Sequence, residues 1–156
     1  MTDPSQVYGK PWSKSQNAFV DNTLVQGDNV VQCQRFRNTI AEINAGKTLL
    51  AAVADKKYRI IDWTFIAYGG AAAAATAVTL LATQSSAVAL ATIAVGGLSQ
   101  SAVVKPDHTN CAVLADGASF IANDEETAIT IGKTGGSDLA TCTGIDVILT
   151  YTLEDA

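Results

Sequence analysis

The chain has 156 residues, of which 48% are apolar and 16% are charged, and its formal net charge is −5. This length and composition fit one packed domain and exclude a disordered chain. The charge is unevenly placed, because residues 107–156 contain nine acidic residues and a single basic one, Lys133. An acidic chain repels phosphate groups, so the sequence predicts no nucleic-acid partner.

The cysteines indicate a reducing compartment. Cys33, Cys111 and Cys142 are odd in number and form no CxxC pair, which predicts free thiols. The opening stretch, MTDPSQVYGKPWSKSQNAFVDN, is polar and lacks the apolar segment of a targeting signal. We therefore expect the protein to fold in a cytoplasm.

Residues 1–28 have the composition of an arm, rich in Ser, Gln, Asn, Asp and Pro. One interpretation is a disordered tail. The other is an extended arm that becomes ordered against a partner, with large side chains as anchors. The anchors would be Tyr8, Trp12 and Phe19. Residues 29–156 would then form the folded domain.

The next segments alternate between apolar and polar residues, as strands do. The stretch AGKTLLAAVADKK predicts a short strand closed by a turn at ADKK, and KKYRIIDWTFIAYGG predicts a longer one ended by Gly69-Gly70. Asp62 and Thr64 would share one face of the longer strand. The opposite face would hold Ile61, Trp63, Phe65 and Ala67.

Residues 63–104 contain no Asp, Glu, Lys or Arg, and three structures are compatible with this window. A membrane helix is disfavoured by Gln84, Ser85 and Ser86 in its centre. A short helix at Ala71–Ala75 is open, because alanine is the best helix former. The favoured structure is two strands joined by a QSS turn, TAVTLLAT and AVALATIAV, with Val88 and Leu90 facing one way and Ala89, Ala91 and Ile93 the other.

Small side chains occur on both faces of these two expected strands. That pattern indicates strands covered on both sides, once by the domain's own sandwich and once by a neighbouring subunit. Burial of this kind would explain the absence of charge in the window.

The C-terminal third continues the β pattern. SAVVKP and NCAVLADGASFIAN are expected to contribute strands, followed by TAITIGKTGG, in which Ile129 and Ile131 share a face. GIDVILTYTLED alternates over ten residues, with Ile148 as the exception. Turn signals recur roughly every 8–12 residues, the spacing of a sandwich or barrel.

Catalytic patterns are sparse, and we predict no catalytic residue, no metal and no cofactor. His108 and Cys111 could ligate a metal or form a Cys/His pair, but no second cluster has suitable spacing. The two GKT tripeptides, at residues 46–48 and 132–134, lack the upstream glycine of a phosphate loop and favour turns. Asp124, Glu125 and Glu126 could bind a hard cation but lack the spacing of a calcium loop, which favours a solvated acidic turn.

From about residue 38 to the end, the chain resembles the small jelly-roll decoration (cement) and head-fibre proteins of tailed bacteriophages. The resemblance lies in INAGKTLLAAVADKKYRIIDWTFIAYGG and in GASFIANDEETAITIGKTGGSDLATCTGIDVILTYTLED. It implies a β-sandwich, homotrimers and attachment to the outside of a capsid, often through an N-terminal arm. It brings no catalytic residues.

The expected fold is therefore an all-β, jelly-roll-like sandwich with an N-terminal arm. The expected function is that of a non-enzymatic virion protein, made in a host bacterial cytoplasm, that decorates a phage capsid as a homotrimer. Its partners would be the major capsid protein and its own copies, with no nucleic acid and no membrane. The alternatives are a receptor- or carbohydrate-binding module of a fibre or tail, and a small hydrolase with His108 as base.

Overall fold

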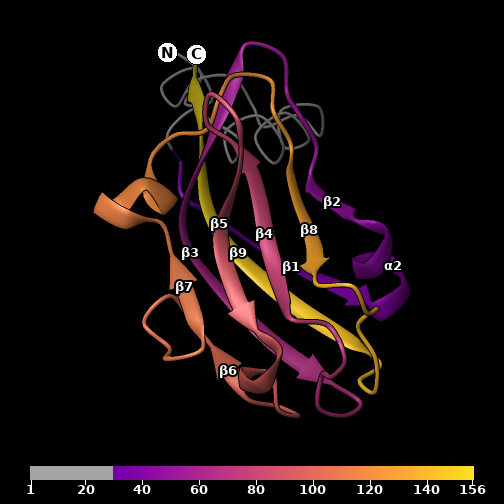
Figure 1. Cartoon of the computed structure of the whole chain (residues 1–156). Helices are drawn as coiled ribbons and strands as arrows, with labels where there is room; N and C mark the ends of the chain where they lie inside the picture. Colours follow the sequence, from indigo (N-terminus) through magenta and orange to yellow (C-terminus); the bar gives the residue numbers. More distant parts are fainter. Residues whose placement is uncertain (1–29) are drawn as a thin grey trace, which may run out of the picture.

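The structure is a computed structural model that describes residues 30–156, and these residues form two packed antiparallel sheets (Figure 1). The strands are β1 (Gln32–Thr39), β2 (Lys47–Leu50), β3 (Lys56–Tyr68), β4 (Ala77–Thr83), β5 (Ala87–Ala94), β6 (Val103–Val104), β7 (Cys111–Val113), β8 (Ile129–Thr134) and β9 (Gly144–Asp155). The helical elements are α2 (Ile40–Ala45), η2 (Val95–Gly97) and η3 (Ala115–Phe120).

The strand order is that of a jelly roll. One sheet has the order β1-β9-β3-β6 and the other the order β2-β8-β4-β5-β7. The pairs are nested along the chain, because β1 pairs with β9, β2 with β8, β3 with β6 and β4 with β5. β7 extends the second sheet at its edge by pairing with β5. The expected all-β, jelly-roll-like sandwich is confirmed.

The core lies between the two sheets, where alternate residues of each strand meet. Trp63 and Phe65 of β3 are buried there together with Leu80 of β4, Ile93 of β5 and Ile131 of β8. The expected inward faces of the last two strands are also confirmed, because Ile129, Ile131, Ile145, Val147, Leu149 and Tyr151 are all buried. Leu153 packs against this core from a partly buried position.

Two β-bulges change the predicted faces. The register between β3 and β9 shifts between Ile60 and Asp62, so Ile61 is the extra residue and is 40% exposed while Ile60 is buried. The prediction that Ile61 faces the core with Trp63 was therefore wrong. A second shift in the β4–β5 pairing leaves Leu90 opposite no single partner, and Leu90, Ala91 and Ile93 are all buried. A bulge adds one residue and so reverses the alternation beyond it.

The uncharged window is β-structured, as expected. β4 and β5 form a hairpin around residues 84–86, where Ser85 has a φ of 60°. The alternative helix at Ala71–Ala75 does not form; Ala73 instead bridges Ala140 in antiparallel fashion. Among the described residues, no helix is both long and apolar enough to cross a membrane.

The sequence prediction missed the helix α2, which joins the two sheets between β1 and β2. Thr39 is its N-cap: the Thr39 Oγ1 accepts from the Glu42 backbone N–H, and the Glu42 carboxylate accepts from the Thr39 backbone N–H. This reciprocal capping box has the signature Thr-x-x-Glu, which is legible in the sequence. The stretch NCAVLADGASFIAN was also only partly predicted, because β7 is followed by the 3₁₀ segment η3 rather than by more strand.

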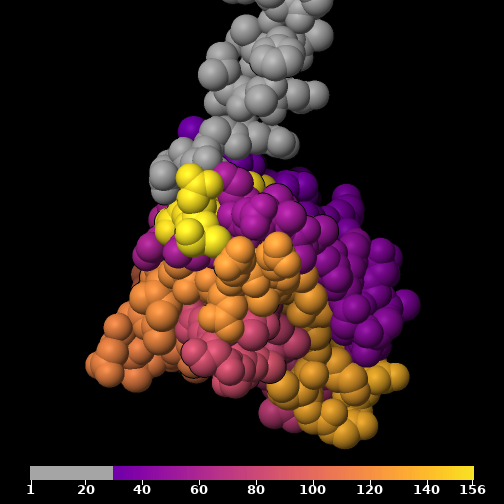
Figure 2. Space-filling model, turned by 90° about the horizontal axis from the view of Figure 1, so that it is seen from above, coloured from indigo at the N-terminus to yellow at the C-terminus, as the bar shows by residue number. Residues whose placement is uncertain are grey.

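The ends of β2, β4 and β9 come together at one end of the sandwich. Figure 2 looks onto this end and shows the yellow C-terminal residues beside the purple segment that contains the β2–β3 loop and the orange segment that precedes β8. The Ala156 backbone N–H donates to the Asp55 carbonyl, and the Glu126 backbone N–H donates to the Lys56 carbonyl. This end therefore collects the acidic loop that the sequence marked as a candidate cation site.

Candidate functional site

The expected anchors Tyr8, Trp12 and Phe19 lie outside the described residues, so their role stays a prediction. The boundary placed between residues 28 and 29 likewise falls at the edge of the described chain. The candidate groups that the structure does place are the acidic loop, His108 with Cys111, the two GKT tripeptides and the outer faces of the sheets.

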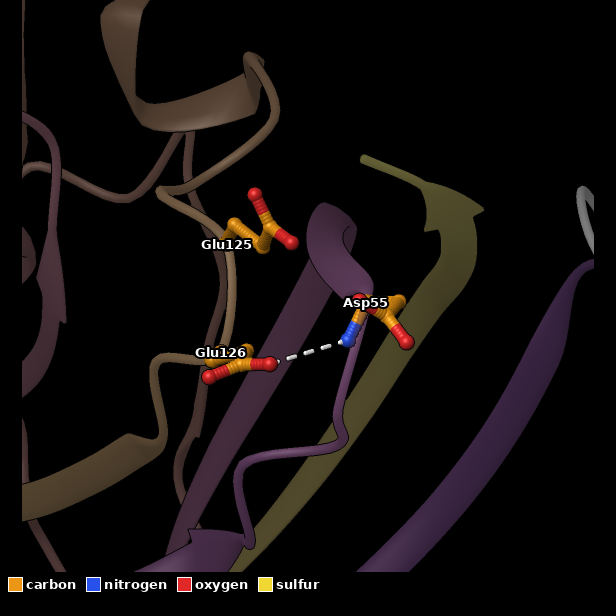
Figure 3. Close-up of side chains that lie close together, drawn as sticks. All are labelled: Asp55, Glu125 and Glu126. Carbon is orange, nitrogen blue, oxygen red and sulfur yellow. Dashed lines mark hydrogen bonds between the residues drawn. The ribbon is translucent and has the colours of Figure 1, made fainter.

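The acidic loop, residues 124–126, lies beside the β2–β3 loop. Three exposed carboxylates meet there, those of Asp55, Glu125 and Glu126, and their oxygens lie within 4.8 Å of one another (Figure 3). Asp55 comes from the β2–β3 loop, and the two glutamates come from the loop before β8. Three carboxylates supply only part of the six to eight oxygen ligands that calcium takes.

The hydrogen bonds of this loop show a structural use for its acidic residues. The Glu126 carboxylate accepts from the Asp55 backbone N–H at 3.2 Å, the dashed line in Figure 3. The Asp124 carboxylate accepts from the Ser85 backbone N–H at 2.7 Å, in the β4–β5 turn. The Thr127 hydroxyl donates to the Asp124 carbonyl at 2.7 Å. From the sequence, Asp124 was a possible ligand beside Glu125 and Glu126, although a solvated turn was favoured. The structure places Asp55, and not Asp124, beside the two glutamates.

His108 lies in the turn after β6, and Cys111 is the first residue of β7. The His108 Nδ1 accepts from the Asn110 backbone N–H at 3.1 Å, and the Cys111 backbone N–H donates to the His108 carbonyl at 2.8 Å. Burial raises the pKa of the Cys111 thiol, which is the opposite of what a nucleophilic cysteine requires.

The two GKT tripeptides have different roles from each other. Gly46 caps the C-terminus of α2 with a φ of 80°, and Lys47 and Thr48 begin β2. Gly132, Lys133 and Thr134 are not a turn but part of β8, so that prediction was wrong for the second tripeptide. Neither tripeptide precedes a helix, which is the structural context that a phosphate-binding loop needs.

A charged cluster on the outer face of the first sheet was not foreseen. Asp146 of β9 is buried and forms an ion pair with Arg35, and its second oxygen lies 4.0 Å from the Arg37 Nε. The Arg37 guanidinium lies 4.1 Å from the centroid of the Tyr68 ring. Arg35 and Arg37 alternate along one strand, so the sequence did show that they share a face, but their partner comes from a strand more than a hundred residues away.

The two outer faces of the sandwich differ completely in charge. Strand register places Lys57, Arg59 and Asp62 of β3 and Asp146 and Glu154 of β9 on the outer face of the first sheet, with Arg35 and Arg37 beside them. The corresponding face of the second sheet is built from Ala, Thr and Gly with a single Leu. These residues are Thr48, Ala77, Thr79, Leu81, Thr83, Ala87, Ala89, Thr92, Ala94, Ala112, Thr130, Gly132 and Thr134.

Comparison of the chain with protein-family models, with curated proteins and with solved structures finds no match in any of the three.

Proposed function

We propose that the chain is a capsid decoration (cement) protein that binds the outside of a phage head as a homotrimer and stabilises it. The observation that carries the proposal is the complete nested jelly-roll order, from the outer pair β1–β9 to the inner hairpin β4–β5. Jelly rolls are frequent among capsid proteins, although they also form lectins and cupins. The resemblance of the sequence to small phage decoration proteins selects the first of these classes.

The placement of the aromatic side chains favours decoration over carbohydrate binding. A sugar site needs ring faces that a ligand can reach. In the described chain, Tyr58, Trp63, Phe65 and Tyr151 are buried. The Tyr68 ring is covered by Arg37. The Phe120 ring stacks on Trp63.

In this proposal the protein acts by binding and not by catalysis. The role of attachment falls to residues 1–28, with Tyr8, Trp12 and Phe19 as anchors. Each large anchor buried at an interface contributes about 2 kcal/mol or more. Loss of all three would then weaken attachment by several orders of magnitude.

The test is co-sedimentation with heads of the phage that encodes the chain, assembled without it. The full chain should sediment with the heads and raise the temperature at which they break. The triple variant Tyr8→Ala, Trp12→Ala, Phe19→Ala should lose binding, whereas His108→Ala, in the turn after β6, should bind like the wild type. A full chain that stays in the supernatant contradicts the proposal, and a triple variant that still binds moves attachment to the sandwich.

A further inference from the structure

The outer face of the second sheet is a surface without charge on a charged protein. We call the residues named above for this face, from Thr48 of β2 to Ala112 of β7, the neutral face. Figure 1 shows β8, β4 and β5 in front of β9 and β3, with no other described segment crossing them. The described residues carry eight basic and twelve acidic side chains, and register places none of them on this face.

An antiparallel sheet that faces water on its outer side normally carries polar and charged side chains there. The first sheet follows this rule, with seven charged side chains on its outer face. The second sheet carries threonine as the only polar residue type on its outer face and has no charged side chain there on any strand. We propose that the neutral face is the surface through which copies of this chain associate with one another.

The charge of the protein indicates that the partner bound to the neutral face is a second copy of the chain. Each chain has a net charge of −5, so two copies repel one another unless they meet through surfaces that carry no like charges. The neutral face meets that condition when it contacts the same face of a second copy. A partner recognised by its charge, such as a basic protein or nucleic acid, would find no matching group here.

The shape of the neutral face also fits close packing. A hollow of about 310 Å³, lined by Ala77, Thr92 and Ala94 among others, lies at one end of the strands. A second hollow of about 410 Å³, lined by Leu81, Thr83 and Ala87 among others, lies at the other end. Short side chains between the hollows allow two sheets to approach to about 10 Å, the distance of packed sheets.

The size of the neutral face sets the strength of the contact. The five strands of the second sheet contain 28 residues. Each residue covers roughly 16 Å² of the plane of the sheet at ordinary strand spacing, so the face has an area of about 450 Å² per copy. A standard stable interface takes about 800 Å² per partner. The contact should therefore be reversible and depend on concentration. Because both copies contribute the same face, this contact joins copies in pairs. It is separate from the contacts within the proposed homotrimer, and the inference does not rest on that proposal.

The test is sedimentation velocity of the full chain across a concentration series, without any capsid present, so that it is independent of the decoration proposal. Thr92→Lys places a charge in the hollow at one end of the neutral face. Its matched control is Thr64→Lys, a partly buried threonine on the outer face of the charged sheet. A second variant, Ala94→Lys, changes an exposed position at the end of β5 and so avoids any folding defect.

The wild type and Thr64→Lys should associate in multiples of 16.2 kDa. Ala94→Lys and Thr92→Lys should dissociate roughly a hundredfold more readily, because each contact then buries unpaired like charges. A wild type that stays monomeric at every concentration overturns the inference. So does association that survives Ala94→Lys, or that is lost only when residues 1–28 are deleted.

Discussion

Phe120 stacks on Trp63, with ring centroids 5.1 Å apart and ring planes 7° from parallel. Trp63 is fully buried in β3, and Phe120 ends η3, which follows β7 and contacts β3 of one sheet and β5 of the other. The stack therefore closes the core on the side where β6 and β7 are too short to cover it.

We expect Phe120→Ala to lower the free energy of unfolding by about 3 kcal/mol, because the ring is lost and Trp63 gains contact with water. The measurement is urea denaturation followed by Trp63 fluorescence in a Trp12→Phe background. Before urea is added, the Phe120→Ala protein should already emit at a longer wavelength than its parent. Ile121→Ala is the control, since Ile121 is 48% exposed and should change stability by less than about 0.5 kcal/mol. Equal effects of the two variants would contradict the role given to the stack.

Gly144, at the start of β9, is required for close approach of the backbone. A Cβ at this position would lie 2.0 Å from the Asn38 carbonyl oxygen and 2.5 Å from the Tyr68 hydroxyl, whereas a Cβ on Gly136 would meet nothing within 4 Å. Gly144→Ala should therefore destabilise the protein by about 3 kcal/mol, and Gly136→Ala should be close to neutral. Thermal unfolding of the two variants measures the difference, and a harmless Gly144→Ala would show that β1 and β3 can move apart there.

Glu42 should make the stability of the protein depend on pH. The Glu42 carboxylate accepts a hydrogen bond from the Thr39 backbone N–H, which has the largest effect on its pKa, and a second one from the Lys47 ammonium group. These bonds hold the pKa of Glu42 at about 2, below the usual 4.5. A lowered pKa in the folded state means that the contribution is complete above pH 4.5 and is lost as the pH falls towards 2.

The variant Glu42→Gln should therefore be less stable than the wild type at pH 7, and the difference should shrink between pH 4.5 and pH 2. Denaturation at a series of pH values measures it. Glu125→Gln, an exposed carboxylate in the loop before β8, controls for the general effect of removing one negative charge. A difference that is constant with pH would mean that the capping box does not depend on the charge of Glu42.

The three cysteines should react at very different rates. Cys33 is exposed, Cys111 is partly buried and Cys142 is buried, and burial raises the pKa of both the Cys111 and Cys142 thiols. Because the thiolate is the reactive form, a disulfide reagent should modify one thiol quickly in the native protein and all three after unfolding. Cys33→Ser should remove the fast phase, and a fast phase that persists in this variant would contradict the assignment.

Most of the β structure could be predicted from the local alternation of apolar and polar residues. The pattern in residues 145–154 predicted the inward faces of β9, and the QSS turn predicted the β4–β5 hairpin in the middle of a window that resembles a membrane helix by charge alone. These predictions worked because the period of a strand depends on adjacent residues. The loop position of His108 was also predicted locally, because Pro106 precedes it in the stretch KPDHTN.

Other features depend on residues that are far apart in the sequence, and only the tertiary structure decided them. A bulge at Ile61 or Leu90 exists only relative to the partner strand, so no local pattern shows which residue is extra. The pairing of Arg35 with Asp146 requires the nested order that places β1 beside β9. The bond between the Asp55 backbone and Glu126 requires the same order, which brings the β2–β3 loop to the loop before β8. The same order gathers the uncharged residues of five strands on one face. The sequence could predict that β4 and β5 lack charge, but strand pairing decided that their neighbours β2, β7 and β8 lack it on that side as well.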